Sequence, residues 1–90
     1  MTTFQRLIIT LDGLTAGDYL AQVRNPDPPG LGRGLRSLAV HADPLGDTIE
    51  AVLGWDGRPP SPAEAEILAG LPMTPEVVAV ECRSLEAVAA

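Results

Sequence analysis

The chain has 90 residues, a formal net charge of −6 and a single cysteine. This length suits one small domain, residues 1–90, with a modest core. The acidic charge disfavours nucleic acid and anionic membrane surfaces as partners, and the lone cysteine excludes an intramolecular disulfide.

The first half of the chain predicts a strand, a helix and a long loop. Phe4–Leu11 is rich in β-branched and apolar residues and stops at an Asp-Gly pair, which predicts a strand. Thr15 is a good N-cap, and the apolar spacing after it predicts a helix over Ala16–Arg24. Asn25–Gly34 contains three prolines and three glycines, so we predict a loop without regular structure.

The middle of the chain predicts a β-hairpin. Two apolar runs, Leu35–Ala42 and Thr48–Trp55, flank the turn sequence Asp43-Pro44-Leu45-Gly46. Asp, Pro and Gly occupy the positions that a type I turn favours. We expect Trp55 to close the hairpin against Leu35.

The last third predicts a helix and a strand. Ser61, Pro62 and Glu64 form a capping signal for a helix over Pro62–Ala69, and Gly70 suits the left-handed residue after it. Its core-facing residues are predicted to be Ile67, Leu68 and Leu71. Glu76–Arg83 is rich in valine and predicts the fourth strand, with residues 85–90 as a flexible tail.

The order of these elements, βαββαβ, predicts an α+β fold of the ferredoxin-like pattern. We expect a four-stranded antiparallel sheet in the order 4-1-3-2, with two short helices on one face and the other face open. Strand alternation assigns these residues to the helix-covered face: Leu7, Ile9, Leu11, Leu38, Val40, Ile49, Ala51, Leu53, Val78, Val80 and Cys82.

The same alternation assigns the open face, which is too apolar for a solvated surface. Its expected members are Arg6, Ile8, Thr10, Ser37, Ala39, His41, Thr48, Glu50, Val52, Val77, Ala79, Glu81 and Arg83. We expect Ile8, Val52 and Val77 at its apolar centre. A bulge at Gly46 would swap the faces of one hairpin strand, but the register without it segregates the residues better.

Several residues are candidates for a chemical role. His41, the only histidine, is a candidate general base, although a structural role at a strand end is favoured. Cys82 alternates onto the core side, where a cysteine is an inert apolar residue. The glycine-rich loop before Leu35 lacks the strand and helix of a phosphate-binding loop; Arg33 and Arg36 could hold an anion there, but a connector is favoured.

Arg6, Glu50, Glu81 and Arg83 are expected to form a charged network across three strands. We predict no metal site, because one His and one Cys cannot supply the usual four Cys/His ligands of zinc, and we predict no cofactor. No apolar run approaches the ~20 residues of a membrane span, so we expect no membrane partner and a cytoplasmic location. The arginine, alanine, glycine and proline content without lysine is typical of a G+C-rich, bacterial genome.

The pattern resembles that of small dimeric α/β-barrel proteins, which pair two such sheets face to face. The Cys-x-x-Cys of copper chaperones and the aromatic, basic sheet of RNA-recognition domains are both missing from this sequence. We predict a non-enzymatic module that forms a homodimer through its open sheet face and binds a protein or small-molecule partner. The alternative is a cofactor-free isomerase, cyclase or oxygenase of the dimeric barrel type, with His41 as base.

Overall fold

The computed structural model describes residues 2–86. Its elements are β1 (Thr2–Leu11), α1 (Ala16–Gln22), the 3-10 helix η1 (Pro29–Gly32), β2 (Leu35–His41), β3 (Thr48–Asp56), α2 (Pro62–Leu68) and β4 (Val77–Glu86). The expected α+β class is confirmed. β4 includes residues 85 and 86, which were predicted to belong to a flexible tail; the rest of that predicted tail, residues 87–90, lies outside the described residues.

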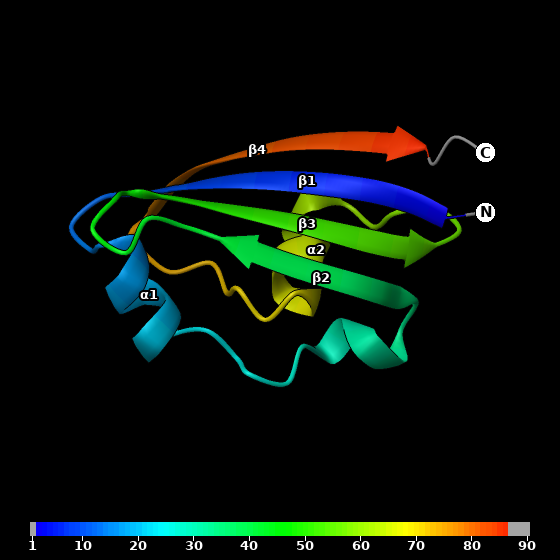
Figure 1. Cartoon of the computed structure of the whole chain (residues 1–90), viewed down its shortest axis with the longest axis horizontal. Helices are drawn as coiled ribbons and strands as arrows, with labels where there is room; N and C mark the ends of the chain where they lie inside the picture. The colour runs from blue at the N-terminus through cyan, green and yellow to red at the C-terminus, as the bar shows by residue number, and fades with distance from the viewer. Residues whose placement is uncertain (1, 87–90) are drawn as a thin grey trace.

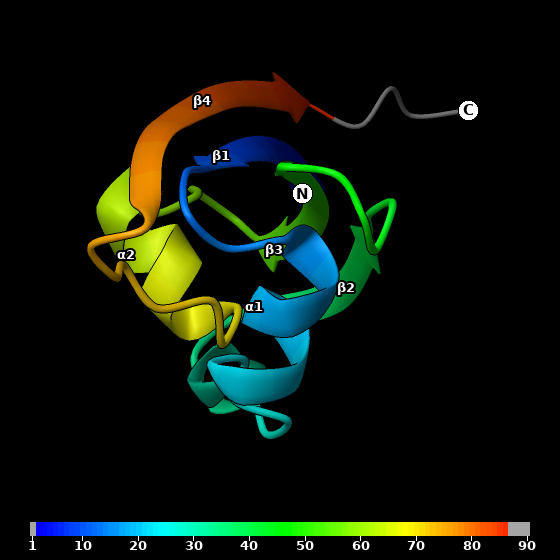
Figure 2. The same cartoon turned by 90° about the vertical axis from the view of Figure 1, so that its left-hand side faces the viewer.

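The four strands form one antiparallel sheet in the order β2-β3-β1-β4 (Figure 1). Read from the β4 edge, this order is 4-1-3-2. The ferredoxin-like pattern is met only loosely, because each helix has 7 residues whereas β1 and β4 have 10. The sheet curls around both helices, which lie within its concave face (Figure 2).

Alternation along the two central strands builds the core. Every second residue of β1 and β3 is buried, as period-two side-chain alternation requires. These residues meet both helices and the segment after α2 in one cluster, whose buried members are Leu7, Ile9, Leu11, Ala16, Tyr19, Leu35, Ile49, Ala51, Leu53, Trp55, Ala65, Ala69 and Leu71.

The hairpin has the predicted register. Ala39 pairs with Val52 and His41 with Glu50, so no bulge at Gly46 swaps a face. The backbone N–H of Gly46 donates to the carbonyl of Asp43 at 2.9 Å, which closes the predicted turn.

The face assignment at the start of β4 was wrong. The pairing of β1 with β4 shifts at Thr10 and Leu11, so that Leu11 pairs with Val77 rather than with its neighbour Val78. Val77 packs against the core cluster, and Val78 is 58% exposed. A bulge adds one unpaired residue and so exchanges the faces of the residues before it.

The loop over residues 25–34 also differs from the prediction, because η1 forms within it. Gly30 of η1 is buried, and a Cβ there would lie 2.8 Å from the carbonyl oxygen of Leu68 in α2. Only a residue without a side chain lets η1 lie this close to α2. The segment therefore contacts α2 through Gly30, whereas most of its other residues are exposed.

α2 begins and ends at the expected signals. The Ser61 hydroxyl accepts a hydrogen bond from the Glu64 N–H at 3.4 Å, and Gly70 has a φ of +78°. The Leu71 N–H donates to the carbonyl of Glu66, which completes the left-handed C-terminal motif. The core face of α2 was misassigned at Ile67, which is 57% exposed, whereas its neighbour Glu66 is buried.

The N-cap of α2 gives a first prediction. Replacing Ser61 by Ala removes the side-chain acceptor and should lower the free energy of unfolding by about 0.5–1 kcal/mol in urea denaturation. Ser61→Asp, which keeps an acceptor, is the matched control and should retain the wild-type midpoint. An unchanged midpoint for Ser61→Ala would show that this cap does not contribute to stability.

Candidate functional site

Two neighbouring rows of side chains cross the open face of the sheet. We call one the acidic row, which contains His41, Glu50, Ile8 and Glu81 on adjacent strands. We call the other the basic row, which contains Ala39, Val52, Arg6 and Arg83. Twelve of the thirteen residues predicted for this face lie on it: the eight of the rows, with Thr10, Thr48, Ala79 and Ser37 beside the rows. The exception is Val77, which the β4 bulge turns toward the core.

The expected charged network consists of two ion pairs between the rows. Arg6 donates to Glu50 Oε2 at 2.7 Å, and Arg83 lies 3.6 Å from Glu81. The Arg6 and Glu50 side chains are 50% and 35% exposed, so the pair is largely screened by water. Arg6 and Arg83 are direct cross-strand partners, and like charges in that position oppose each other. Each arginine therefore forms its ion pair with a glutamate of the acidic row.

An aromatic residue that was not assigned to the open face extends it at the other end. Phe4 lies directly across from Gly54, and a Cβ on Gly54 would meet both the Phe4 ring and the Ser37 hydroxyl. Phe4 has the same strand parity as Arg6 and Ile8, which is the signal that could have placed it. The apolar part of the face thus contains Phe4, Ile8 and Val52 rather than Ile8, Val52 and Val77.

His41 lies at the corner of this face, beside the hairpin turn. A hollow of about 350 Å³ brings it together with Asp43 and Glu50. However, Glu50 is already paired with Arg6, and Asp43 Oδ1 accepts the Leu45 N–H at 3.1 Å. His41 itself is exposed. It lies on the open face rather than between the sheet and the helices.

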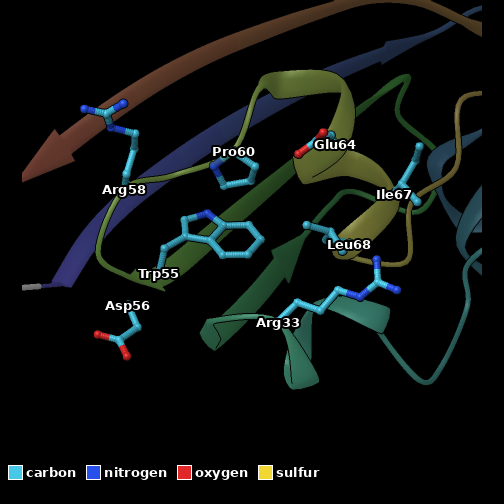
Figure 3. A pocket seen from close by; sticks show the side chains of 8 residues that line it. All are labelled: Arg33, Trp55, Asp56, Arg58, Pro60, Glu64, Ile67 and Leu68. Atoms are coloured by element: carbon cyan, nitrogen blue, oxygen red, sulfur yellow. The ribbon is translucent and has the colours of Figure 1, made fainter.

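A larger hollow of about 490 Å³ lies on the opposite side of the sheet, beside α2 (Figure 3). We call it the α2 groove. Its lining residues come from η1, the end of β3, the following loop and α2: Arg33, Trp55, Asp56, Arg58, Pro60, Glu64, Ile67 and Leu68. The less favoured alternative for this loop was an anion site formed by Arg33 and Arg36; the fold instead places Arg33 in the same groove as Arg58.

Gln5 of β1 holds two walls of the α2 groove in place. Its side-chain oxygen accepts the Trp55 indole N–H at 2.9 Å, and its amide N–H donates to the Pro60 carbonyl at 3.1 Å. Trp55 also pairs with Leu35, as expected, and is 2% exposed. Gln5 is itself buried; its bond to Trp55 is buried as well, and its bond to Pro60 is partly buried, so the groove has a fixed floor.

Glu66, on the core side of α2, is a buried acid that the sequence analysis missed. It is 1% exposed, and within the described part of the chain its Oε2 atom has no hydrogen-bond partner. Burial raises the pKa of the Glu66 carboxyl above its ordinary value. Burial and the nearby charge of Glu66 raise the pKa of Tyr19 to about 12, and the Tyr19 hydroxyl donates to the Pro72 carbonyl at 2.6 Å.

The fold and these surfaces define a small α+β protein with one uncovered sheet face and one groove beside a helix. In comparisons with known proteins, no family model, no curated protein and no solved structure matches the chain. None of the described helices is long and apolar enough to cross a membrane. Residues 2–86 contain no group of three or more His, Cys, Asp or Glu arranged to hold a metal ion.

Proposed function

We propose that this protein is a non-enzymatic binding module that forms a homodimer through its open sheet face. The observation that carries the proposal is the pair of adjacent rows with opposite charge. A two-fold interface requires a surface that complements itself. Consider a two-fold axis that runs along the face, perpendicular to the strands and between the two rows. This axis places the acidic row of one copy over the basic row of the other.

In that arrangement Glu81 of each protomer faces Arg83 of its partner, and Glu50 approaches the partner's Arg6. The half-buried Ile8 and Val52 lie close to the axis, where a second copy removes their remaining surface from water. Burying apolar surface contributes about 25 cal/mol per Å², which supplies the association energy, while the charges select the orientation. Two sheets stacked in this way form a two-layer core like that of a sandwich.

An exchange of charges tests this orientation. We expect Glu81→Arg and Arg83→Glu each to raise the dimer dissociation constant about tenfold or more, because both contacts between positions 81 and 83 then join like charges. An equimolar mixture of the two variants should recover wild-type affinity, because each arginine of the first variant then faces a glutamate of the second. Sedimentation velocity measures the three affinities.

The control is Arg24→Glu, which also replaces an arginine by a glutamate. Arg24 follows α1 in the chain and lies outside the sheet. This variant should leave the dimer intact. If the mixed variants stay as weakly associated as each alone, the rows do not face each other. If wild type is a monomer at tens of micromolar, the homodimer is refuted.

The enzyme alternative rests on the hollow beside His41. A general base needs a partner that orients it and a concave site with convergent polar groups. Both carboxylates near His41 are engaged, Glu50 by Arg6 and Asp43 by the turn backbone. These contacts favour a non-enzymatic module over a reaction centre.

A further inference from the structure

We propose that the α2 groove binds a small organic anion, with its carboxylate on Arg33 and its apolar body on the wall formed by Leu68, Ile67 and Pro60. This site is separate from the open sheet face and does not depend on the homodimer. The volume of about 490 Å³ lies within the range of small-molecule sites, which are mostly apolar with a few placed polar groups.

The distribution of arginines supports an anionic ligand. The chain has six arginines, and three of them, Arg6, Arg36 and Arg83, form ion pairs. Two of the other three, Arg33 and Arg58, line this groove without an acidic partner among the described residues. In a chain of net charge −6, two unpaired cations in one groove are a local exception.

The carboxylates of the groove do not cancel both cations. Asp56 accepts a hydrogen bond from Arg36 at 2.9 Å, and that bond and charge hold the pKa of Asp56 below its usual range. Glu64 is the remaining acid, so the lining together with Arg36, the partner of Asp56, carries one net positive charge. One negative charge on the ligand complements it.

The apolar wall determines the rest of the ligand. Figure 3 shows Arg33 extending past Leu68 toward Ile67, while Arg58 lies on the other side of Trp55 and points outward. Ile67 is exposed although it is apolar, and it lies next to the Arg33 end of the groove. A flat or flexible hydrocarbon body can cover this wall while its carboxylate meets the guanidinium of Arg33.

The site contains its own reporter, because Trp55 is the only tryptophan of the chain. We would titrate three probes with the same body and different charge: 4-phenylbutyrate, 4-phenylbutanol and 4-phenylbutylamine. We expect 4-phenylbutyrate to change the Trp55 fluorescence saturably, with a dissociation constant on the order of 1 mM for a ligand of this size. The alcohol should bind more weakly and the amine weakest.

Three variants locate the anion. Arg33→Gln should weaken 4-phenylbutyrate binding about two- to fivefold, the range for a partly exposed charge pair, and Arg58→Gln should weaken it less. Glu64→Gln should tighten binding, because it removes the opposing charge. Arg24→Gln, outside the groove, is the control and should leave binding unchanged.

Amide chemical-shift changes in nitrogen-15 spectra give a second readout. They should concentrate at the Trp55 indole N–H and at residues 58–68 rather than on the open sheet face. Equal binding of the three probes, tightening by Arg33→Gln, or shift changes confined to the sheet face would each overturn the proposal. The failure of this test leaves the charge-exchange test of the homodimer unaffected.

Discussion

Val52→Glu is expected to convert the homodimer into a folded monomer. Val52 lies at the centre of the open face, directly across from Arg6 on β1 and Ala39 on β2. In the proposed dimer it lies over Glu50 of the partner, so the variant places two carboxylates together at an apolar centre. Like charges brought together at an interface cost several kcal/mol, which corresponds to a dissociation constant raised roughly 100-fold or more.

The fold should survive this substitution, because Val52 lies outside the helix-covered core and a glutamate there can pair with Arg6. Light scattering coupled to size exclusion at tens of micromolar gives the mass, and circular dichroism gives the stability. Ile67→Glu is the matched control, since it adds the same charge to an apolar residue that is 57% exposed on the helix side. A dimeric Val52→Glu, or loss of the dimer in the control, would contradict the proposed interface.

Glu66→Met is expected to stabilise the protein at neutral and alkaline pH. Glu66 is buried and its Oε2 atom lacks a partner among the described residues. An unsatisfied buried polar group costs about 1–3 kcal/mol, and an apolar side chain of similar length removes that cost. Urea unfolding at pH 8 should therefore show a gain of this size.

The pH dependence provides a second test of Glu66. Its pKa is raised in the folded state above the ordinary value of 4.5, so the unfolded chain loses this proton first as pH rises. The contribution of Glu66 to stability is thus fully present below pH 4.5 and is lost as pH rises through the folded-state pKa. Between pH 4.5 and pH 8, the free energy of unfolding should therefore fall less for Glu66→Met than for wild type.

Glu64→Met is the control for both measurements, because it removes the same charge from an exposed position of the same helix. It should leave the pH slope close to that of wild type. If Glu66→Met destabilised the protein at pH 8, or if its pH slope equalled that of wild type, Glu66 would not be a buried, unsatisfied acid.

Local signals in the sequence were sufficient for most of the elements. The hairpin could be predicted because a turn sequence separates two strongly β-forming runs, and α2 because Ser61 and Gly70 mark its ends. These features depend on neighbours in the chain. For the same reason the open face could be derived from alternation once the strands were known.

The errors arose where a distant contact determines the local structure. The β4 bulge depends on how β1 and β4 pair at Thr10 and Leu11, which no local pattern records. A helix of seven residues has too few turns for its apolar spacing to fix which side is buried, so Ile67 was placed inward and Glu66 was overlooked. The packing of η1 became apparent only from the contact between Gly30 and α2.

The open face and the α2 groove also differ in how far they could be predicted from the sequence. The charged rows of the open face follow from strand register, so twelve of the thirteen residues predicted for this face lie on it. The α2 groove joins Arg33 to the stretch Trp55–Leu68, and only the fold brings Arg33 and Arg58 to one hollow. Its ligand chemistry could not be predicted from spacing along the chain.

Isotope-filtered NMR on a mixture of carbon-13-labelled and unlabelled protein would show whether two copies pair through the open sheet face. This experiment detects only contacts between a labelled chain and an unlabelled one. In the proposed dimer we expect intermolecular contacts between the methyl groups of Val52 in one protomer and Ile8 in its partner. No intermolecular contacts at tens to hundreds of micromolar, or contacts that involve Ile67 of α2 instead, would contradict it.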